Sequence, residues 1–243
     1  MPESQKHGFV WQADIMANVY RVPAEVIATE NYTATHDVPA AHNALDHVNL
    51  SIKTTGNAKR VDMGDALRIY DTIASGEAFH MVVIHWEQLE AQKRIVSINE
   101  VNLTGATHAL FGTLTREQIV ALDTAVKAYP KGCSAKDPKC APITALCDEL
   151  CGKSGAIQMN KKIDSKSQRR LQCSFYNFTK FLADHPERIV ATSVTCEFRG
   201  GRIQQCIESS PRQRSMVSSS REKLASSRFL APQEKLELTP CPE

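Results

Sequence analysis

The strand pattern that most constrains the fold lies in residues 80–86, His-Met-Val-Val-Ile-His-Trp. Successive side chains of a strand point to opposite faces, so the four consecutive apolar residues from Met81 to Ile84 make both faces apolar. Such a strand belongs inside a sheet that is covered on both sides. Residues 94–101 alternate between apolar and polar, and this alternation predicts a second strand beside the first.

Three stretches show the three- and four-residue spacing of apolar side chains that predicts helices: residues 8–20, 64–73 and 115–128. The last of them opens with a capping-box pattern, Thr115 followed by Gln118, and Pro130 lies just beyond its end. From residue 43 to residue 99 the expected order is strand, helix, strand, strand. This order predicts an α/β (α+β) fold with a central mixed β-sheet flanked by helices.

An alternating segment before the second helix presents polar side chains on one face of a strand. In Val-Asn-Leu-Ser-Ile-Lys, residues 48–53, the apolar side chains share one face, and Ser51 and Lys53 share the other. Carboxylates flank this strand in the sequence: Asp37, Asp62 and Asp65. An amine among carboxylates is what metal-assisted phosphodiester hydrolysis needs. The carboxylates hold Mg²⁺, and the lysine offsets charge on the scissile phosphate or helps to activate the attacking water.

The combination of Asp37 with Ser51-x-Lys53 resembles the PD-(D/E)xK nuclease superfamily, above all the type II restriction endonucleases. Their pattern is an aspartate near a proline, followed on the next strand by Asp or Glu, any residue, and Lys. Asp37 lies two residues before Pro39 and sixteen before Lys53, which suits that pattern. Ser51 departs from it. A subgroup of restriction enzymes has the same Ser-x-Lys, with the missing carboxylate supplied from the helix that follows.

The resemblance implies a restriction-endonuclease-like fold and a site-specific deoxyribonuclease that cuts duplex DNA with Mg²⁺, leaving 5′-phosphate and 3′-hydroxyl ends. Asp37 and Asp65 would hold the metal, with Asp62 as the alternative to Asp65. Lys53 would position or activate the attacking water, and Ser51 would stand in for the usual carboxylate without ligating strongly. One active site cuts one strand, so a homodimer that matches palindromic DNA is also implied.

Each of these residues also has a structural reading that the sequence leaves open. Asp37 could be a turn residue beside a proline, and Lys53 a solvent-facing strand residue. Asp62 and Asp65 could cap the helix that follows them. Glu87 and Glu100 could act behind the metal site, although exposed positions at the ends of a hairpin explain them equally well. The histidines at 36, 42 and 47 fit an exposed loop better than a metal site.

Residues 160–208 are expected to form the part that recognises DNA. The basic and amide side chains expected to contact DNA are Lys166, Gln168, Arg169, Arg170, Gln172, Arg199 and Arg202. Arg and Gln can make paired hydrogen bonds to guanine and adenine, and Lys serves phosphates. Gly200-Gly201 predicts a two-residue hairpin turn with Arg199 and Arg202 at its tip. A solvated basic loop and an ordinary exposed turn are the alternatives.

Residues 131–152 form a cysteine-rich insertion. Cys133, Cys140, Cys147 and Cys151 could together hold Zn²⁺, but they lack the paired C-x₂-C spacing of common zinc modules, and small buried side chains are the alternative. Eight cysteines in a chain without a secretory pattern predict a reduced, intracellular (cytoplasmic) protein.

The chain of 243 residues is expected to form one nuclease-like domain, residues 1–208, and a flexible Ser- and Arg-rich tail, residues 209–243. No apolar run has the length of a membrane span, so no membrane partner is expected. The net charge is only +2, so overall charge does not indicate nucleic-acid binding. The alternative function is a non-catalytic nucleic-acid-binding protein on a nuclease-like or zinc-stabilised scaffold. A structural protein without a nucleic-acid role is the third hypothesis.

Overall fold

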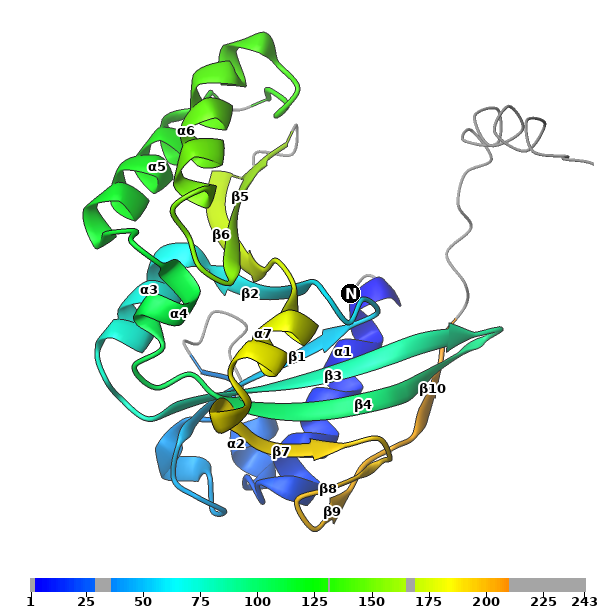
Figure 1. Ribbon diagram of the computed structural model, residues 1–243. Helices are drawn as coiled ribbons and strands as arrows, with labels where there is room; N and C mark the ends of the chain where they lie inside the picture. Colours follow the sequence, from blue (N-terminus) through cyan, green and yellow to red (C-terminus); the bar gives the residue numbers. More distant parts are fainter. Residues whose placement is uncertain (1–2, 29–35, 131, 165–168, 210–243) are drawn as a thin grey trace, which may run out of the picture. The chain divides into compact units, whose positions relative to one another are not determined.

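A computed structural model describes residues 3–28, 36–130, 132–164 and 169–209 (Figure 1). They belong to one compact unit, residues 1–210. The predicted tail, residues 209–243, lies outside the described residues apart from Ser209. Strands in a mixed parallel and antiparallel sheet, with helices on both sides of it, confirm the predicted fold class.

The central sheet contains β1 (Asn49–Thr55), β3 (Phe79–Leu89), β4 (Gln92–Asn102), β7 (Ile189–Ser193) and β10 (Cys206–Glu208). The order is β1-β3-β4-β10, and β7 pairs with a different part of β4 on the same outer edge as β10. β1 runs parallel to β3, and the other pairs are antiparallel. β1 is therefore an edge strand. A crossover through β2 and α3 joins it to β3.

A second, antiparallel sheet has the order β2-β6-β5, with β2 (Val61–Asp65), β5 (Ile157–Ile163) and β6 (Arg169–Phe175). Three helices pack on it: α3 (Ala66–Ala74), α5 (Arg116–Ala128) and α6 (Ala141–Cys151). The capping box that the sequence predicts for α5 is confirmed. Gln118 N donates to Thr115 Oγ1 (3.4 Å), and Thr115 N donates to Gln118 Oε1 (3.0 Å).

The two faces of β3 belong to two different cores, as its doubly apolar pattern requires. Phe79, Met81 and Val83 point into the core shared with α3, α5 and α6, and we call this side the α3 face. Val82 and Ile84 point into the core shared with the first helix, and we call this side the α1 face. The prediction of a covered central strand is confirmed.

The first helix consists of α1 (Glu3–Asp14) and a π-helical turn, η1 (Ile15–Val19). It packs against side chains from the last described strands as well as those of the sheet. Trp11 Nε1 donates to Gln204 O (2.8 Å), and Gln204 N donates to Asp14 Oδ2 (2.9 Å). The two ends of the described chain therefore meet on the α1 face.

The remaining elements are α2 (Ala24–Ala28), η2 (Ala40–His42), α4 (Thr107–Phe111), η3 (Pro138–Cys140), α7 (Phe178–Asp184), η4 (Pro186–Arg188), β8 (Glu197–Phe198) and β9 (Gly201–Arg202). Across the described ranges, no helix combines the length and the apolar character needed to span a membrane.

Two boundaries differ from the sequence prediction. The helix expected from residue 64 begins at Ala66, because the chain stays extended as β2 up to Asp65. The turn of the β8–β9 hairpin is Arg199-Gly200, with φ +49° and +81°, so Gly200-Gly201 as the turn is wrong by one residue. Gly201 is needed for packing instead, since a Cβ there would lie 2.4 Å from Asn18 O.

Candidate functional site

Asp37 lies beside the free edge of β1. Val38 forms an isolated antiparallel bridge with Leu50, and Asp37 N donates to Leu50 O (2.9 Å). This short pairing holds the carboxylate of Asp37 alongside the next residues of the strand. The position follows from the extended geometry that Pro39 favours in the residue before it.

Asp37 Oδ2 collects three donors from consecutive residues of β1. Ser51 Oγ lies at 3.1 Å, Ile52 N at 2.5 Å and Lys53 Nζ at 3.3 Å. The side chains of Lys53 and Asp37 are 25% and 21% exposed, so water reaches both. The structure thus brings together three of the residues singled out from the sequence. Ser51 supplies a hydrogen bond to Asp37 where the usual second carboxylate would repel it.

The contact with Ile52 also has a structural role. An edge strand leaves outward N–H groups without a partner strand, and Asp37 satisfies one of them. Asp37 Oδ1, in contrast, accepts no hydrogen bond from any residue that the structure describes. One oxygen of this carboxylate therefore braces the strand edge, and the other is available to a ligand.

Asp65 and Asp62 lie elsewhere around the start of α3. Asp65 caps the helix, since its Oδ1 accepts from Arg68 N (2.9 Å). Asp62 is exposed on β2, opposite Ser174 of β6. Within the described ranges, the ligand atoms of the three predicted metal ligands, Asp37, Asp62 and Asp65, do not gather within 4.8 Å of one another. These three carboxylates therefore do not converge on one point in the structure.

The start of α3 acts electrostatically on His36, the residue before Asp37, through Arg68. Burial lowers the pKa of His36, and the positive charge of Arg68 lowers it further, whereas Glu77 and Asp37 raise it. His36 Nδ1 is buried and has no hydrogen bond to a described residue, so His36 is not the exposed loop histidine that was expected. The sequence analysis missed Arg68. The available signal was its position three residues after the helix cap.

A second polar cluster lies on the α1 face of the same sheet. Arg199 Nη1 donates to Asp46 Oδ2 (2.6 Å) and to Glu100 Oε2 (2.7 Å). The other oxygen of Glu100 lies 2.7 Å from His80 Nδ1. Glu100 is fully buried, which excludes the exposed hairpin position that was one of its two interpretations. Glu87 does occupy such a position and pairs with Arg94.

Asp46, His80 and Glu100 could hold a metal ion, because their ligand atoms all lie within 4.8 Å of one another. An ion that used Asp46 Oδ2 and Glu100 Oε2 would compete with Arg199 for the same two oxygens. The guanidinium is therefore the cation that balances these carboxylates in the structure. No local pattern in the sequence indicated this cluster, because its members come from separate loops and strands.

The charged partners of Arg199 stabilise both its charge and its strained backbone conformation. Burial opposes the charge of Arg199, but the hydrogen bonds and charges of Asp46 and Glu100 raise its pKa above the usual arginine value. Burial, and then the charge of Glu100, raise the pKa of Tyr20, whose ring lies 5.9 Å from the guanidinium. The positive φ of Arg199 is unfavourable for a residue with a Cβ atom, and two charge-assisted hydrogen bonds offset this cost.

The predicted DNA-contacting residues fall into three groups. Lys166 and Gln168 lie outside the described residues. Arg169 turns inward and donates to the carbonyl groups of Tyr129 (2.9 Å), Asp164 (3.0 Å) and Pro130. Arg170, Gln172 and Arg202 keep solvent access.

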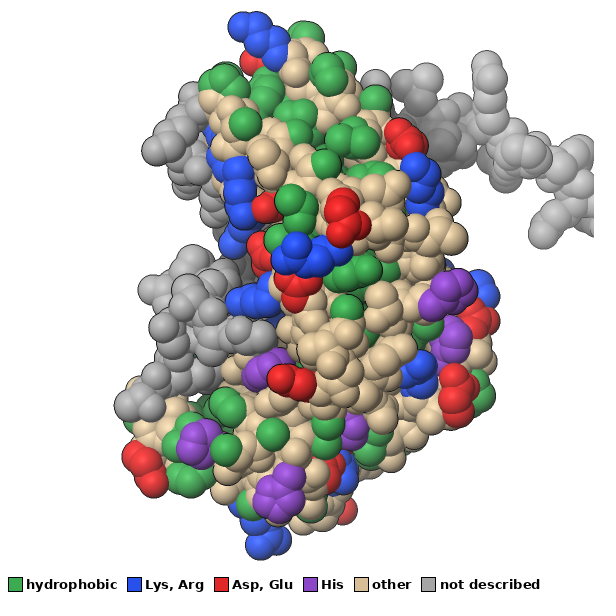
Figure 2. All heavy atoms as spheres, turned by 90° about the vertical axis from the view of Figure 1, so that its left-hand side faces the viewer, with side chains coloured by type: hydrophobic (Ala, Val, Ile, Leu, Met, Phe, Trp, Pro, Cys, Tyr) green, Lys and Arg blue, Asp and Glu red, His purple; other side chains and the backbone are tan. Residues whose placement is uncertain are grey.

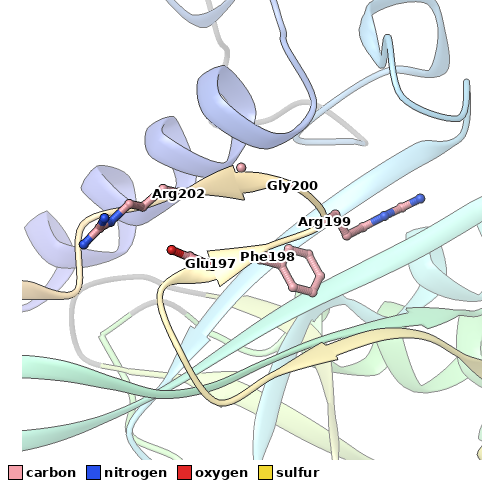
Figure 3. Close-up of a pocket in the computed structure, with 6 residues that line it drawn as sticks. Glu197, Phe198, Arg199, Gly200 and Arg202 are labelled. Atoms are coloured by element: carbon pink, nitrogen blue, oxygen red, sulfur yellow. The ribbon is translucent and has the colours of Figure 1, made fainter.

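The hairpin arginines differ from each other. Figure 3 shows Arg199 and Arg202 leaving the β8–β9 hairpin in opposite directions. A shallow hollow of about 390 Å³ lies along residues 197–202. Of these two arginines Arg202 is the exposed one, because Arg199 is engaged by the carboxylates of the α1 face.

The β5–β6 pair carries a row of polar side chains, which we call the polar ladder. Its cross-strand pairs are Gln158 with Ser174, Asn160 with Gln172, and Lys162 with Arg170. The alternate residues of both strands, such as Met159 and Cys173, point into the core under the helices. Arg60 Nη2 donates to Asn160 Oδ1 (2.6 Å), which adds a cation to the ladder.

The helix-covered side of this sheet has a different character. Figure 2 shows basic and acidic side chains lying next to one another near the middle of that face. Arg116 of α5, for example, pairs with Asp71 of α3 (2.7 Å). Opposite charges that pair in this way offset each other's potential.

The cysteines of the insertion pack in the core instead of forming one four-cysteine group. Cys147 Sγ contacts Met159 O (3.5 Å), and Met159 N donates to Cys151 Sγ (3.3 Å). A hydrogen bond from Cys147 lowers the pKa of Cys151 to about 7. No cysteine belongs to a potential metal group of three or more ligands in the part of the chain that is described.

Comparisons with protein-family models, with curated proteins and with solved structures find no match to this chain. Its function has to be argued from the chemistry of its own sites.

Proposed function

We propose that this protein is a Mg²⁺-dependent endonuclease that hydrolyses duplex DNA at specific sequences, in the manner of type II restriction enzymes. The observation that carries the proposal is the 3.3 Å contact between Lys53 Nζ and Asp37 Oδ2 at an accessible strand edge. A nuclease needs an acid and an amine side by side where a long polyanion can reach them, and this edge offers both.

Asp37 and Asp65 are the carboxylates that would hold Mg²⁺, with Asp62 as the alternative to Asp65. Carboxylate oxygens suit this hard cation, and Asp37 Oδ1 accepts no hydrogen bond from a described residue. Asp65 would have to share or release its contact with Arg68 N to join the same ion. When bound, Mg²⁺ would act as a Lewis acid that draws charge from the phosphate.

Lys53 would lie against the scissile phosphate, where its ammonium group offsets the negative charge that builds up as water attacks. Ser51 would keep Asp37 oriented, since its hydroxyl donates to Asp37 Oδ2. Arg68 would add a second cation, because its charge already acts on His36, the neighbour of Asp37.

The polar ladder is the surface we assign to base contact. A two-stranded ribbon fits the major groove, and amide and guanidinium groups can read base edges there. Asn160 and Lys162 join the predicted Arg170 and Gln172 on this ribbon. Arg202 would contact phosphate. Arg169 and Arg199 are engaged by the protein itself and would support these surfaces from behind.

A homodimer and an intracellular location complete the proposal. One site of this kind cuts one strand, so two copies related by a two-fold axis would cut both strands of a palindrome. The described cysteines are all free thiols, which suits a reducing compartment.

The test is plasmid cleavage with Mg²⁺ by the full chain and by Lys53→Ala. We expect the variant to lose roughly 10²–10⁴-fold in rate, because the group that compensates charge at the phosphate is gone. Lys153→Ala is the matched control, since it also removes a lysine paired with a carboxylate (Glu149, 2.6 Å). A Lys53→Ala rate within a few-fold of the parent would remove Lys53 from the mechanism.

A second candidate is a nucleic-acid-binding protein without catalysis. The observation that favours it is the separation of Asp37, Asp62 and Asp65, together with a serine at the position of the second carboxylate. It predicts salt-sensitive duplex binding and intact DNA with Mg²⁺, Mn²⁺, Co²⁺ and Ca²⁺ alike. Cleavage with any of these metals that depends on Lys53 would exclude this candidate.

A further inference from the structure

A cavity of about 280 Å³ lies on the α3 face of the central sheet, between β3, β4 and α7. Its polar wall is formed by His85, Ser97 and Asn99, and its apolar wall by Val83, Phe178 and Leu182. Among the residues that the structure describes, no charged side chain lines it. Cavities with an apolar body and a few converging polar groups are the usual form of a small-ligand site.

The strand register puts this cavity directly beside Lys53. Lys53 is the partner of Val83, and Val83 is the partner of Asn99, so the three form one row across the sheet on the same face. The next row on that face consists of Thr55, His85 and Ser97, about 7 Å further along the strands. Lys53 itself does not line the cavity, because its Nζ contacts Asp37 at the outer edge of β1. A phosphate held at this amine would lie one strand away from a cavity that could hold the rest of a nucleotide.

Part of the hydrogen-bonding capacity of the polar wall is not used by the protein. The His85 ring makes no hydrogen bond to a described residue. Asn99 Oδ1 accepts from Thr192 Oγ1 (2.8 Å), but Asn99 Nδ2 reaches Ser97 Oγ only at 3.5 Å. Burial lowers the pKa of His85, with Glu87 opposing the shift, so the ring stays neutral at pH 7 and presents one donor and one acceptor. Such a wall suits the edge of a heteroaromatic ring.

The apolar wall suits the faces of the same ring. Phe178 is held in place by its contact with Phe175, at a ring-centroid distance of 5.0 Å, and Leu182 lies one helical turn further along α7. The two walls together fit a planar group that has polar edges and apolar faces. Next to a phosphate site, a nucleobase is such a group.

We propose that this cavity receives a nucleobase of the nucleic acid whose phosphate lies at Lys53. This inference rests on the function proposed above. In duplex DNA the base would have to leave the stack. That step costs a few kcal/mol, and the contacts in the cavity would offset part of this cost.

The test uses the full chain and the four 2′-deoxynucleosides, each titrated to about 10 mM, with ligand-observed saturation-transfer NMR. We expect at least one nucleoside to bind in the millimolar range, with the strongest transfer to its base protons. His85→Ala should weaken binding about tenfold by removing a hydrogen bond, and Leu182→Trp should abolish it by filling the cavity. Leu89→Trp, which adds the same side chain at the exposed last residue of β3, should have no effect.

The two proposals fail in different ways. Lys53→Ala should leave nucleoside binding unchanged but weaken binding of the corresponding 5′-monophosphate, because only the phosphate contacts Lys53. No nucleoside binding, or binding unchanged in both His85→Ala and a folded Leu182→Trp, would overturn the base cavity even if Lys53→Ala abolishes cleavage. If nucleoside binding requires His85 but cleavage does not depend on Lys53, the proposal of a nucleobase cavity would stand and the proposed nuclease mechanism would be excluded.

Discussion

The central sheet carries a paired carboxylate and cation on each of its faces, and the two pairs differ in how much water reaches them. On the α3 face, Asp37 and Lys53 both keep about a fifth or a quarter of their side-chain surface exposed at the edge of β1. On the α1 face, Arg199 bridges a partly exposed Asp46 and a completely buried Glu100. A carboxylate–cation pair is therefore accessible to solvent on the α3 face, whereas on the α1 face it stabilises a buried carboxylate.

The difference has an energetic reason. A buried carboxylate that loses its cation keeps its full desolvation cost, so Glu100 depends on Arg199. Asp37 keeps Ser51 and Ile52 as donors, and water as well, when Lys53 leaves. The edge pair is thus free to exchange partners, which a binding site requires and a core does not tolerate.

The largest effect on stability is expected from the buried pair. Arg199→Met should lower the free energy of unfolding by about 3–5 kcal/mol, because it leaves the buried Glu100 without its arginine and with His80 as its remaining partner. Chemical denaturation measures this directly. The double variant Arg199→Met with Glu100→Gln should recover part of the loss. A single variant as stable as the parent would show that the two faces do not differ as described.

An intermediate effect is expected from the contact that positions Arg199. Gly201→Ala should cost about 1–3 kcal/mol, because its Cβ would lie 2.4 Å from the backbone oxygen of Asn18. Gly152→Ala is the matched control, since its φ is −66° and the nearest atom lies 3.3 Å from the added Cβ. Equal stability of the two variants would mean that the hairpin can move away without loss.

The smallest effect on stability is expected from the edge pair. Lys53→Ala should change the free energy of unfolding by less than about 1 kcal/mol, as for other solvent-exposed ion pairs. The same protein sample should show the large loss of cleavage expected above. A destabilisation as large as that of Arg199→Met would show that Lys53 has a structural role. The two pairs would then not differ in their contribution to stability.

Local patterns account for most of what the sequence predicted correctly. The doubly apolar run of β3 and the capping box of α5 each depend on residues within a few positions of one another. Asp37, Ser51 and Lys53 could be grouped because a short bridge and one strand are enough to bring them together. The physical cause of each of these features lies in residues that are close together in the sequence.

Contacts between distant segments were out of reach. Arg199 and Glu100 are separated by 99 positions, and no periodicity connects a hairpin turn to a buried strand residue. The turn was misplaced for the same reason: Gly-Gly favours a turn locally, but the close approach to Asn18 assigns Gly201 to packing. β2 was missed because the register of its pairing with β6 shifts between Asp62 and Gly64.

The meeting of Trp11 and Asp14 with Gln204 sets an order on how the chain can mature during its synthesis. The first helix leaves the ribosome early, but strands that complete its apolar surroundings, β8 to β10, emerge some 190 residues later. Until then the part of the helix that packs on those last strands stays uncovered, exposed to chaperones and to neighbouring chains. The α3 face, whose partners emerge earlier, can assemble during that interval, so the proposed catalytic edge takes shape before the core behind it closes.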